Sequence, residues 1–241
     1  MIEDNQVLIN ATNITSEQLE SFYKEVQKIP SERSPIKGFA ARLAFEFMED
    51  TGLRVNELIH VRKMDINFQT MVLTVIMPKI SKRCSCSRWK NKNEYSKAKI
   101  LDYANPVCSD CHGSGRYKRP QKTTITPRIK DKLYLYCESF RPIDLLFPIS
   151  RVSLWKWAKK AGNIAGLNVF VSKDEKEINN MFNHFFRALC TIRMKKDAKD
   201  EEYRDELIMT KRRDTFDKVM DRYTKIDINY LLQWEAKTYL I

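Results

Sequence analysis

The chain has 241 residues and lacks an apolar stretch long enough to cross a membrane. Its amino terminus, MIEDNQVLIN, has neither the basic start nor the apolar run of a signal peptide. No internal repeat and no low-complexity linker divides the sequence. From these absences we expect an intracellular, cytoplasmic protein, and a hydrophobic fraction of 43% is enough to build a core.

Two kinds of catalytic apparatus are also missing. There is no GxxxxGK[ST] loop for nucleotide phosphates and no obvious carboxylate cluster for a pair of metal ions. The chain is instead rich in positive charge, because 43 Lys and Arg residues against 31 Asp and Glu residues give a formal charge of +12. Since neutralising phosphates releases condensed counterions, this excess favours nucleic acid as the partner. A basic surface without a special role is the alternative.

Periodicity and turn residues predict the main elements. A capping box of Thr15 and Gln18 predicts a helix over residues 16–29, and a second helix over 36–47 is expected to end at Gly52 as a left-handed cap. The β-branched segments 71–77 and 122–126 predict two strands. The chain from Pro127 onward is predicted to be almost wholly helical, with breaks near Pro142, Pro148, Gly162 and Gly166.

Three short segments carry the candidate chemistry: TGLRVNEL at 51–58, HFFR at 184–187 and DRYTKID at 221–227. In this order and spacing they resemble the catalytic domain of the tyrosine recombinases, the phage integrase family. The resemblance implies a mainly α (α+β) fold with a small antiparallel β-hairpin or sheet and an active site in a basic cleft. It implies a site-specific DNA recombinase or integrase, the enzyme of a prokaryotic or viral mobile element.

The resemblance also gives individual residues their roles. Arg54 and Arg187 would be the two catalytic arginines, Glu57 the carboxylate that supports Arg54, and Tyr223 the nucleophile. His184 stands three positions before Arg187 on a predicted helix, so both side chains can point at one phosphate. The expected catalytic lysine is Lys79, where the first strand ends; Lys82 and Lys122 are reserves, and a solvated surface lysine is the alternative at each position.

The chemistry explains why these residue types belong together. A tyrosine oxygen that attacks a phosphodiester builds negative charge on the nonbridging oxygens, and two guanidinium groups can stabilise that charge without a metal ion. Lys79 would protonate the leaving 5′ oxygen, and His184 would hold the phosphate or help accept the tyrosine proton. Because a covalent 3′-phosphotyrosine conserves the bond energy, neither ATP nor a catalytic metal is expected.

The sequence departs from the family pattern at one position. Most members carry a His or Trp between the HxxR motif and the tyrosine, but residues 188–222 contain neither. We nominate Lys211 for this role, with an exposed surface lysine as the favoured alternative. Three other tyrosines compete with Tyr223 for the nucleophile role but have the wrong spacing or context: Tyr203, Tyr230 and Tyr239.

Four of the six cysteines form two pairs, C-x-C at Cys84 and Cys86 and C-x-x-C at Cys108 and Cys111. Four thiolates at this spacing suit one tetrahedral structural zinc, and two pairs of unligated thiols are the alternative. The pairs lie in a predicted insertion, residues 80–121, which is basic and poor in aliphatic residues. We expect it to grip DNA through Arg83, Arg88, Lys90, Arg116, Lys118 and Arg119. Cys137 and Cys190, by contrast, sit in apolar helical patterns and are predicted to be core residues.

We therefore expect residues 1–241 to form one tyrosine recombinase catalytic domain without the usual core-binding domain. The partners would be double-stranded DNA and further copies of the chain, as a dimer or tetramer on DNA. An apolar tail, including Ile228 and Trp234, would dock into a neighbouring protomer or pack in cis. The rival functions are a noncatalytic zinc-containing DNA-binding protein of the same fold and a type IB topoisomerase-like enzyme.

Overall fold

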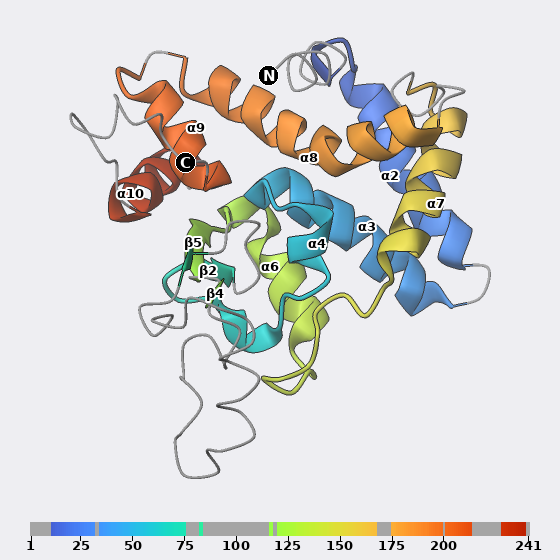
Figure 1. Ribbon diagram of the computed structural model, residues 1–241, viewed down its shortest axis with the longest axis horizontal. Helices are drawn as coiled ribbons and strands as arrows, with labels where there is room; N and C mark the ends of the chain where they lie inside the picture. The colour runs from blue at the N-terminus through green and yellow to red at the C-terminus, as the bar shows by residue number, and fades with distance from the viewer. Residues whose placement is uncertain are drawn as a thin grey trace, which may run out of the picture.

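The computed structural model describes residues 11–31, 34–75, 82–83, 116–117, 120–167, 175–199, 201–213 and 228–239. These residues form a mainly helical fold with small antiparallel sheets, as the sequence predicts (Figure 1). The elements, in chain order, are α2 Ser16–Ser31, α3 Pro35–Thr51, α4 Val55–Leu58, η1 Lys63–Asp65, β1 Ile66–Asn67, β2 Val72–Val75, β3 Lys82–Arg83, β4 Arg116–Tyr117, β5 Gln121–Thr124, α6 Pro127–Cys137, α7 Arg151–Ile164, α8 Glu175–Asp197, α9 Arg204–Arg212 and α10 Ile228–Tyr239.

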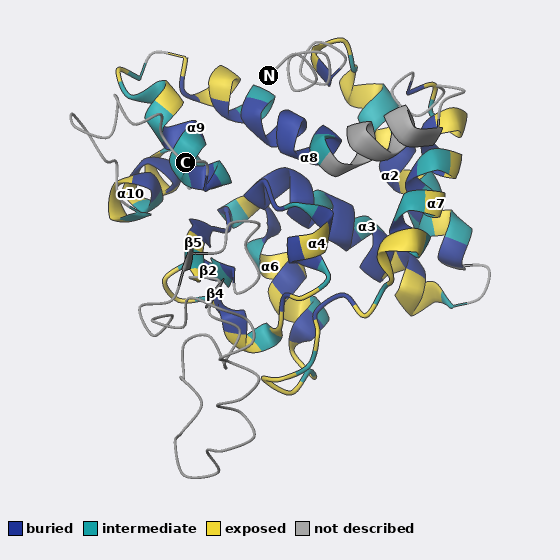
Figure 2. Cartoon of the chain, in the orientation of Figure 1, coloured by how far each residue is buried: buried dark blue, intermediate teal, exposed yellow. Residues whose placement is uncertain are grey.

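Helix α3 is the centre of the main core and packs against α2, α6 and α8. Most of its residues are buried, which Figure 2 shows as a dark blue helix. Phe45 of α3 packs against Phe186 of α8 with tilted rings whose centroids are 4.9 Å apart, and Phe22 of α2 meets Phe45 edge to face at 5.6 Å. Aromatic pairs of this kind are worth about 0.5–1.5 kcal/mol each beyond the area they bury. They hold α8 in a fixed orientation over the end of α3.

The end of α3 is set by Gly52, as expected. Gly52 has φ 63° and caps the helix through its N–H, which donates to the Met48 carbonyl at 3.0 Å. A Cβ atom added to Gly52 would lie 3.4 Å from the Cys190 Sγ and from the Arg212 Cγ. Glycine is therefore favoured at position 52 for two reasons: the backbone is left-handed, and α8 and the end of α9 approach it closely.

The two predicted strands pair in a three-stranded antiparallel sheet with the order β1-β2-β5. Its register places Leu73 opposite Thr123 and Val75 opposite Gln121. Leu73 and Val75 are buried against the core. The second strand ends at Thr124, so the last two residues of the expected segment lie beyond it, and Thr126 is the N-cap of α6. Residues 76–77 of the first predicted strand lie outside the described residues.

One expected break is wrong. Gly162 lies inside α7 and is buried beside Ala158 and Ala161, so its small size serves helix packing rather than a turn. Helix α2 runs to Ser31, two residues beyond its predicted end, with Pro30 in its last turn. The remaining breaks are confirmed, since Pro142 and Pro148 fall between α6 and α7 and Gly166 follows α7 with φ 68°.

The C-terminal helix α10 packs in cis. It contacts α9, β5 and α6 of its own chain. Its Leu231 and Trp234 join a second buried cluster with Leu207 and Met194. Figure 1 shows α10 beside α9. Both cysteines predicted to be core residues are buried: Cys137 at 1% and Cys190 at 0% exposure. Of the helices in the described ranges, none has the length and apolar character that a membrane span requires.

Candidate active site

The segment after α3 carries Arg54 and Glu57. Arg54 is the N-cap of the short helix α4, and its backbone N–H donates to the Glu57 Oε2 at 2.8 Å. Its side-chain Nη1 also donates to the Glu57 Oε1 at 3.4 Å. The Glu57 side chain is 2% exposed, whereas that of Arg54 is 26% exposed. Glu57 thus holds Arg54 at both backbone and side chain while the guanidinium keeps access to the surface.

Arg187 on α8 reaches the same segment. Its Nη1 donates to the Gly52 carbonyl at 2.7 Å, two positions before Arg54, and its Nη2 donates to the Arg212 carbonyl at 2.6 Å. The residue is 1% exposed. The structure therefore places the Arg187 guanidinium against the segment that carries Arg54, although the two arginines are 133 positions apart in sequence, 187 minus 54.

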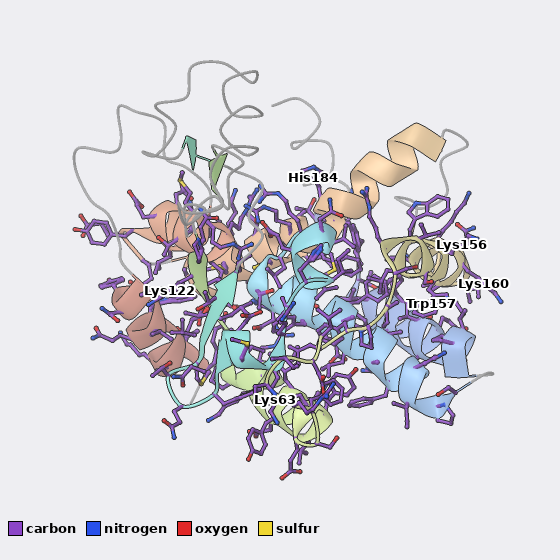
Figure 3. The ribbon with its side chains drawn as sticks, turned by 60° about the horizontal axis from the view of Figure 1, so that its bottom comes forward. Lys63, Lys122, Lys156, Trp157, Lys160 and His184 are labelled. Atoms are coloured by element: carbon purple, nitrogen blue, oxygen red, sulfur yellow. The ribbon has the colours of Figure 1, made fainter. Side chains whose placement is uncertain are left out.

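The two phenylalanines between His184 and Arg187 explain the orientation of the motif. Phe185 and Phe186 are fully buried and meet each other edge to face at 5.0 Å. With these rings fixed in the core, Arg187 is directed to the end of α3, and His184 lies one turn earlier with intermediate exposure. In the view of Figure 3, His184 lies between Lys122 of β5 and the lysines of α7.

A third arginine, Arg213, belongs to this cluster and was missed by the sequence reasoning. Its Nη2 donates to the Glu57 Oε2 at 2.8 Å, and its Nη1 lies 3.4 Å from the carbonyls of Thr51 and Lys211. Burial lowers the pKa of Arg213, and the charge of Arg54 lowers it further, while Glu57 opposes both effects. No pattern pointed to it, because basic residues at the end of α9 look like solvated surface in a lysine-rich chain.

Lys211 is not the exposed residue that was the favoured alternative. It is 0% exposed, and its Nζ donates to the Thr124 carbonyl at 3.0 Å, to the Thr124 Oγ1 at 2.8 Å and to the Glu235 Oε1 at 2.7 Å. An ammonium group has three N–H donors, and three acceptors surround this one. Lys211 can be buried because the Glu235 carboxylate of α10 balances its charge and Thr124 of β5 accepts two of its hydrogen bonds. These contacts favour a structural role for Lys211.

Beneath the site, a buried ion network fixes the last turn of α3. Asp50 accepts from the Thr126 N–H at 2.9 Å and from the Thr126 hydroxyl, and the Arg193 Nη1 lies 3.5 Å from its Oδ1. Burial raises the pKa of Asp50, but the charges of Lys211 and Arg193 and the Thr126 hydrogen bonds outweigh burial and lower it. The carboxylate is therefore ionised in the fold, and it ties α3 to both α6 and α8.

Several predicted site residues lie outside the described residues: Lys79, Tyr223, Cys84, Cys86, Cys108, Cys111, Arg88, Lys90, Lys118 and Arg119. Arg83 and Arg116 lie on β3 and β4, which pair antiparallel with these two residues opposite each other. Lys122 is exposed on β5. Among the residues that the structure describes, no group of three His, Cys, Asp or Glu side chains is arranged to hold a metal ion.

The competing tyrosines lie on or next to the C-terminal helices α9 and α10. Tyr239 donates from its hydroxyl to the Asp197 Oδ2 at 2.6 Å, and burial raises its pKa. Tyr230 lies on α10 and is 40% exposed, and Tyr203 is the N-cap of α9.

A sequence model described as the phage integrase family matches residues 12–191. The match includes Arg54, Glu57, His184 and Arg187 and ends before α9. No curated protein and no solved structure matched the chain.

Proposed function

The chain belongs to the phage integrase family, the tyrosine recombinases, whose members bind DNA, and on that premise we propose that it cuts and rejoins DNA through a covalent 3′-phosphotyrosine at Tyr223. The observation that carries the proposal is the contact of Arg187 with the segment that carries Arg54. The carbonyl of Gly52, two positions from Arg54, accepts a hydrogen bond from Arg187 at 2.7 Å. A guanidinium group on this segment and a second one that reaches it from α8 suit the two nonbridging oxygens of a phosphodiester.

The reaction requires three transfers. The Tyr223 oxygen attacks phosphorus, the bond to the 5′ oxygen breaks, and that oxygen takes a proton from the ammonium of Lys79. Negative charge that builds on the nonbridging oxygens is stabilised by Arg54 and Arg187. Removing one such donor typically slows an enzyme about 10²–10³-fold. His184, one turn before Arg187, holds the phosphate or accepts the tyrosine proton.

Helix α7 offers a basic surface for the DNA backbone outside the site. Lys156 and Lys160 are exposed one turn apart, and Trp157 between them is partly exposed. Figure 3 shows all three together on α7. Lysines contact phosphates without reading the base sequence, so α7 would position the duplex rather than select it.

The cysteine-rich insertion would be held by a structural zinc bound to Cys84, Cys86, Cys108 and Cys111. The pairing of β3 with β4 supports this site, because Arg83 lies opposite Arg116 at the base of the insertion. Cys84 directly follows Arg83, and Cys111 precedes Arg116 by five positions. A zinc there would order the segment that carries Arg88, Lys90, Lys118 and Arg119 and present those residues to DNA.

Recombination joins two duplexes, so we propose a dimer or tetramer on DNA. The cis packing of α10 supports a protomer that folds around its own tail before it assembles. The cellular setting that fits such an enzyme is the cytoplasm of a host that carries a mobile element.

The test is incubation of the protein with nicked suicide duplexes of varied sequence, without divalent metal, followed by denaturing gels. Tyr223→Phe is the variant, and Tyr230→Phe is the matched control. The proposal predicts a covalent adduct that Tyr223→Phe abolishes and Tyr230→Phe keeps. An adduct in both variants moves the nucleophile elsewhere. No adduct on DNA that the protein binds favours the noncatalytic DNA-binding protein, and sequence-independent relaxation of supercoils favours the topoisomerase.

A further inference from the structure

We propose that Arg213 is a positioning residue of the arginine site, which keeps the charge of Arg54 available to a phosphate by sharing the carboxylate of Glu57. The inference rests on the proposed function for the identity of the phosphate as DNA. It adds a residue that lies outside the region matched by the family and that the motifs do not contain.

The two oxygens of Glu57 are divided between two guanidinium groups. Its Oε1 lies 3.4 Å from the Arg54 Nη1, whereas its Oε2 accepts from the Arg213 Nη2 at 2.8 Å. One carboxylate therefore faces two cations, and the trio carries a net charge of +1. Without Arg213, Arg54 would be the remaining cation in contact with this buried carboxylate, and the pair would be neutral. Arg213 thus leaves Arg54 with charge for an anion.

The backbone at Arg213 supports a role for its side chain. The residue has φ 57°, a left-handed conformation that costs a residue other than glycine about 1–2 kcal/mol. Glycine would occupy this helix C-cap without strain. The arginine at this position is held by its contacts, since its guanidinium meets Thr51, Glu57 and Lys211 and its side chain is 2% exposed. A buried cation with a strained backbone therefore stands at a position where the backbone favours glycine.

Arg213 also links the site to the segment that leads to the proposed nucleophile. It directly follows α9, and Tyr223 comes ten positions later, 223 minus 213. The preceding residue, Arg212, accepts the second hydrogen bond of Arg187 through its carbonyl. Neighbouring residues at the end of α9 therefore hold both catalytic arginines, one through Glu57 and the other through a backbone oxygen.

The test compares Arg213→Gln and Arg213→Lys with Arg42→Gln. Arg42 is the control, because it is a partly buried arginine of α3 that pairs with Glu20 and Glu46 and lies nine positions before the helix ends at Thr51. Three quantities are measured for each: the unfolding temperature, the rate of adduct formation on the suicide duplex, and the salt dependence of affinity for an intact duplex. Arg54→Gln and the double variant Arg54→Gln/Arg213→Gln complete the set.

We expect Arg213→Gln to slow adduct formation about 100-fold, because small misplacements of a catalytic group have effects of this size. The slope of log affinity against log salt should fall by about 0.9, one phosphate contact, equally in Arg54→Gln, Arg213→Gln and the double variant. Arg213→Lys keeps a cation beside Glu57, so it should restore the salt slope and most of the rate of adduct formation. This variant also keeps the test decisive if Arg213→Gln does not fold.

A purely structural Arg213 gives a different result. Arg213→Gln would then resemble Arg42→Gln, with a lower unfolding temperature, an unchanged salt slope and an adduct rate near that of the unmodified protein. That result overturns the proposal. If the unmodified protein forms no adduct on any duplex, the recombinase function fails by itself, and the salt slopes still decide whether Arg213 keeps Arg54 available to a phosphate.

Discussion

Replacing Lys211 with Met tests whether this lysine is structural or catalytic. The substitution removes a fully buried ammonium and leaves the Glu235 carboxylate, 3% exposed, without the cation that lies 2.7 Å from its Oε1. Breaking a buried ion pair from one side costs about 3–5 kcal/mol, because the remaining charge stays buried. In a protein of this size each kcal/mol lowers the unfolding temperature by about 2–4 °C, so a loss of about 6–20 °C is expected.

Thermal unfolding followed by circular dichroism measures this loss. The double variant Lys211→Met/Glu235→Leu should recover most of it, since an apolar pair of similar volume replaces the ion pair without an orphan charge. Lys132→Met is the control: its salt bridge to Glu46 is 3.2 Å long but Lys132 is 53% exposed, so a loss below about 1 kcal/mol is expected. If Lys211→Met unfolds within about 1 kcal/mol of the unmodified protein yet forms no adduct, the structural assignment is refuted.

Three further predictions concern Gly52, Asp50 and the cysteine insertion. Gly52→Ala should lower the free energy of unfolding by about 1–2 kcal/mol, because the backbone at Gly52 is left-handed, and it should slow adduct formation. Gly166→Ala is the control: Gly166 is also left-handed, with φ 68°, but follows α7, so this variant should keep the adduct rate, and equal rates in both variants would contradict the role of the Gly52 carbonyl. The pKa of Asp50 is lower in the folded protein, so the stability that Asp50 contributes is present above its unfolded pKa of about 3.9 and is lost as the pH falls below it. In a plot of unfolding temperature against pH, Asp50→Asn should therefore show a shallower fall below about pH 4 than the unmodified protein. An equally steep fall in both proteins would count against this role of Asp50. Removing zinc with a chelator should reduce DNA affinity, and Cys108→Ser should do the same without chelator; unchanged affinity and folding in both would argue against a zinc-held insertion.

The sequence predicted the elements whose signals are local. The Thr15–Gln18 capping box forms as expected, with both reciprocal hydrogen bonds present. Gly52 caps α3, and the two β-branched segments pair within one sheet. Each of these features depends on residues a few positions apart or on alternation along a single strand, so a single sequence is enough to show them.

The burial of charged residues was not predictable in this way. Lys211 and Arg213 are buried because Glu235 and Glu57 lie beside them, and these partners are 24 and 156 positions away. Hydrophobic periodicity reports where apolar side chains gather and treats every lysine or arginine as a surface residue. Gly162 was predicted to break a helix but lies inside α7. A glycine can either end a helix or allow close packing within one, and tertiary packing decides between these two roles.

Peptide mapping of the covalent adduct tests the central claim most directly. The protein is trapped on a suicide duplex without divalent metal, digested with nuclease and protease, and the tyrosine that retains a nucleotide is identified by mass spectrometry, with Arg54→Ala and Arg187→Ala run in parallel. The account predicts a nucleotide linked through its 3′ phosphate to Tyr223, with adduct formation reduced about 10²–10³-fold in either arginine variant. A nucleotide on Tyr203, Tyr230 or Tyr239, or adduct formation that is indifferent to both arginines, would contradict it.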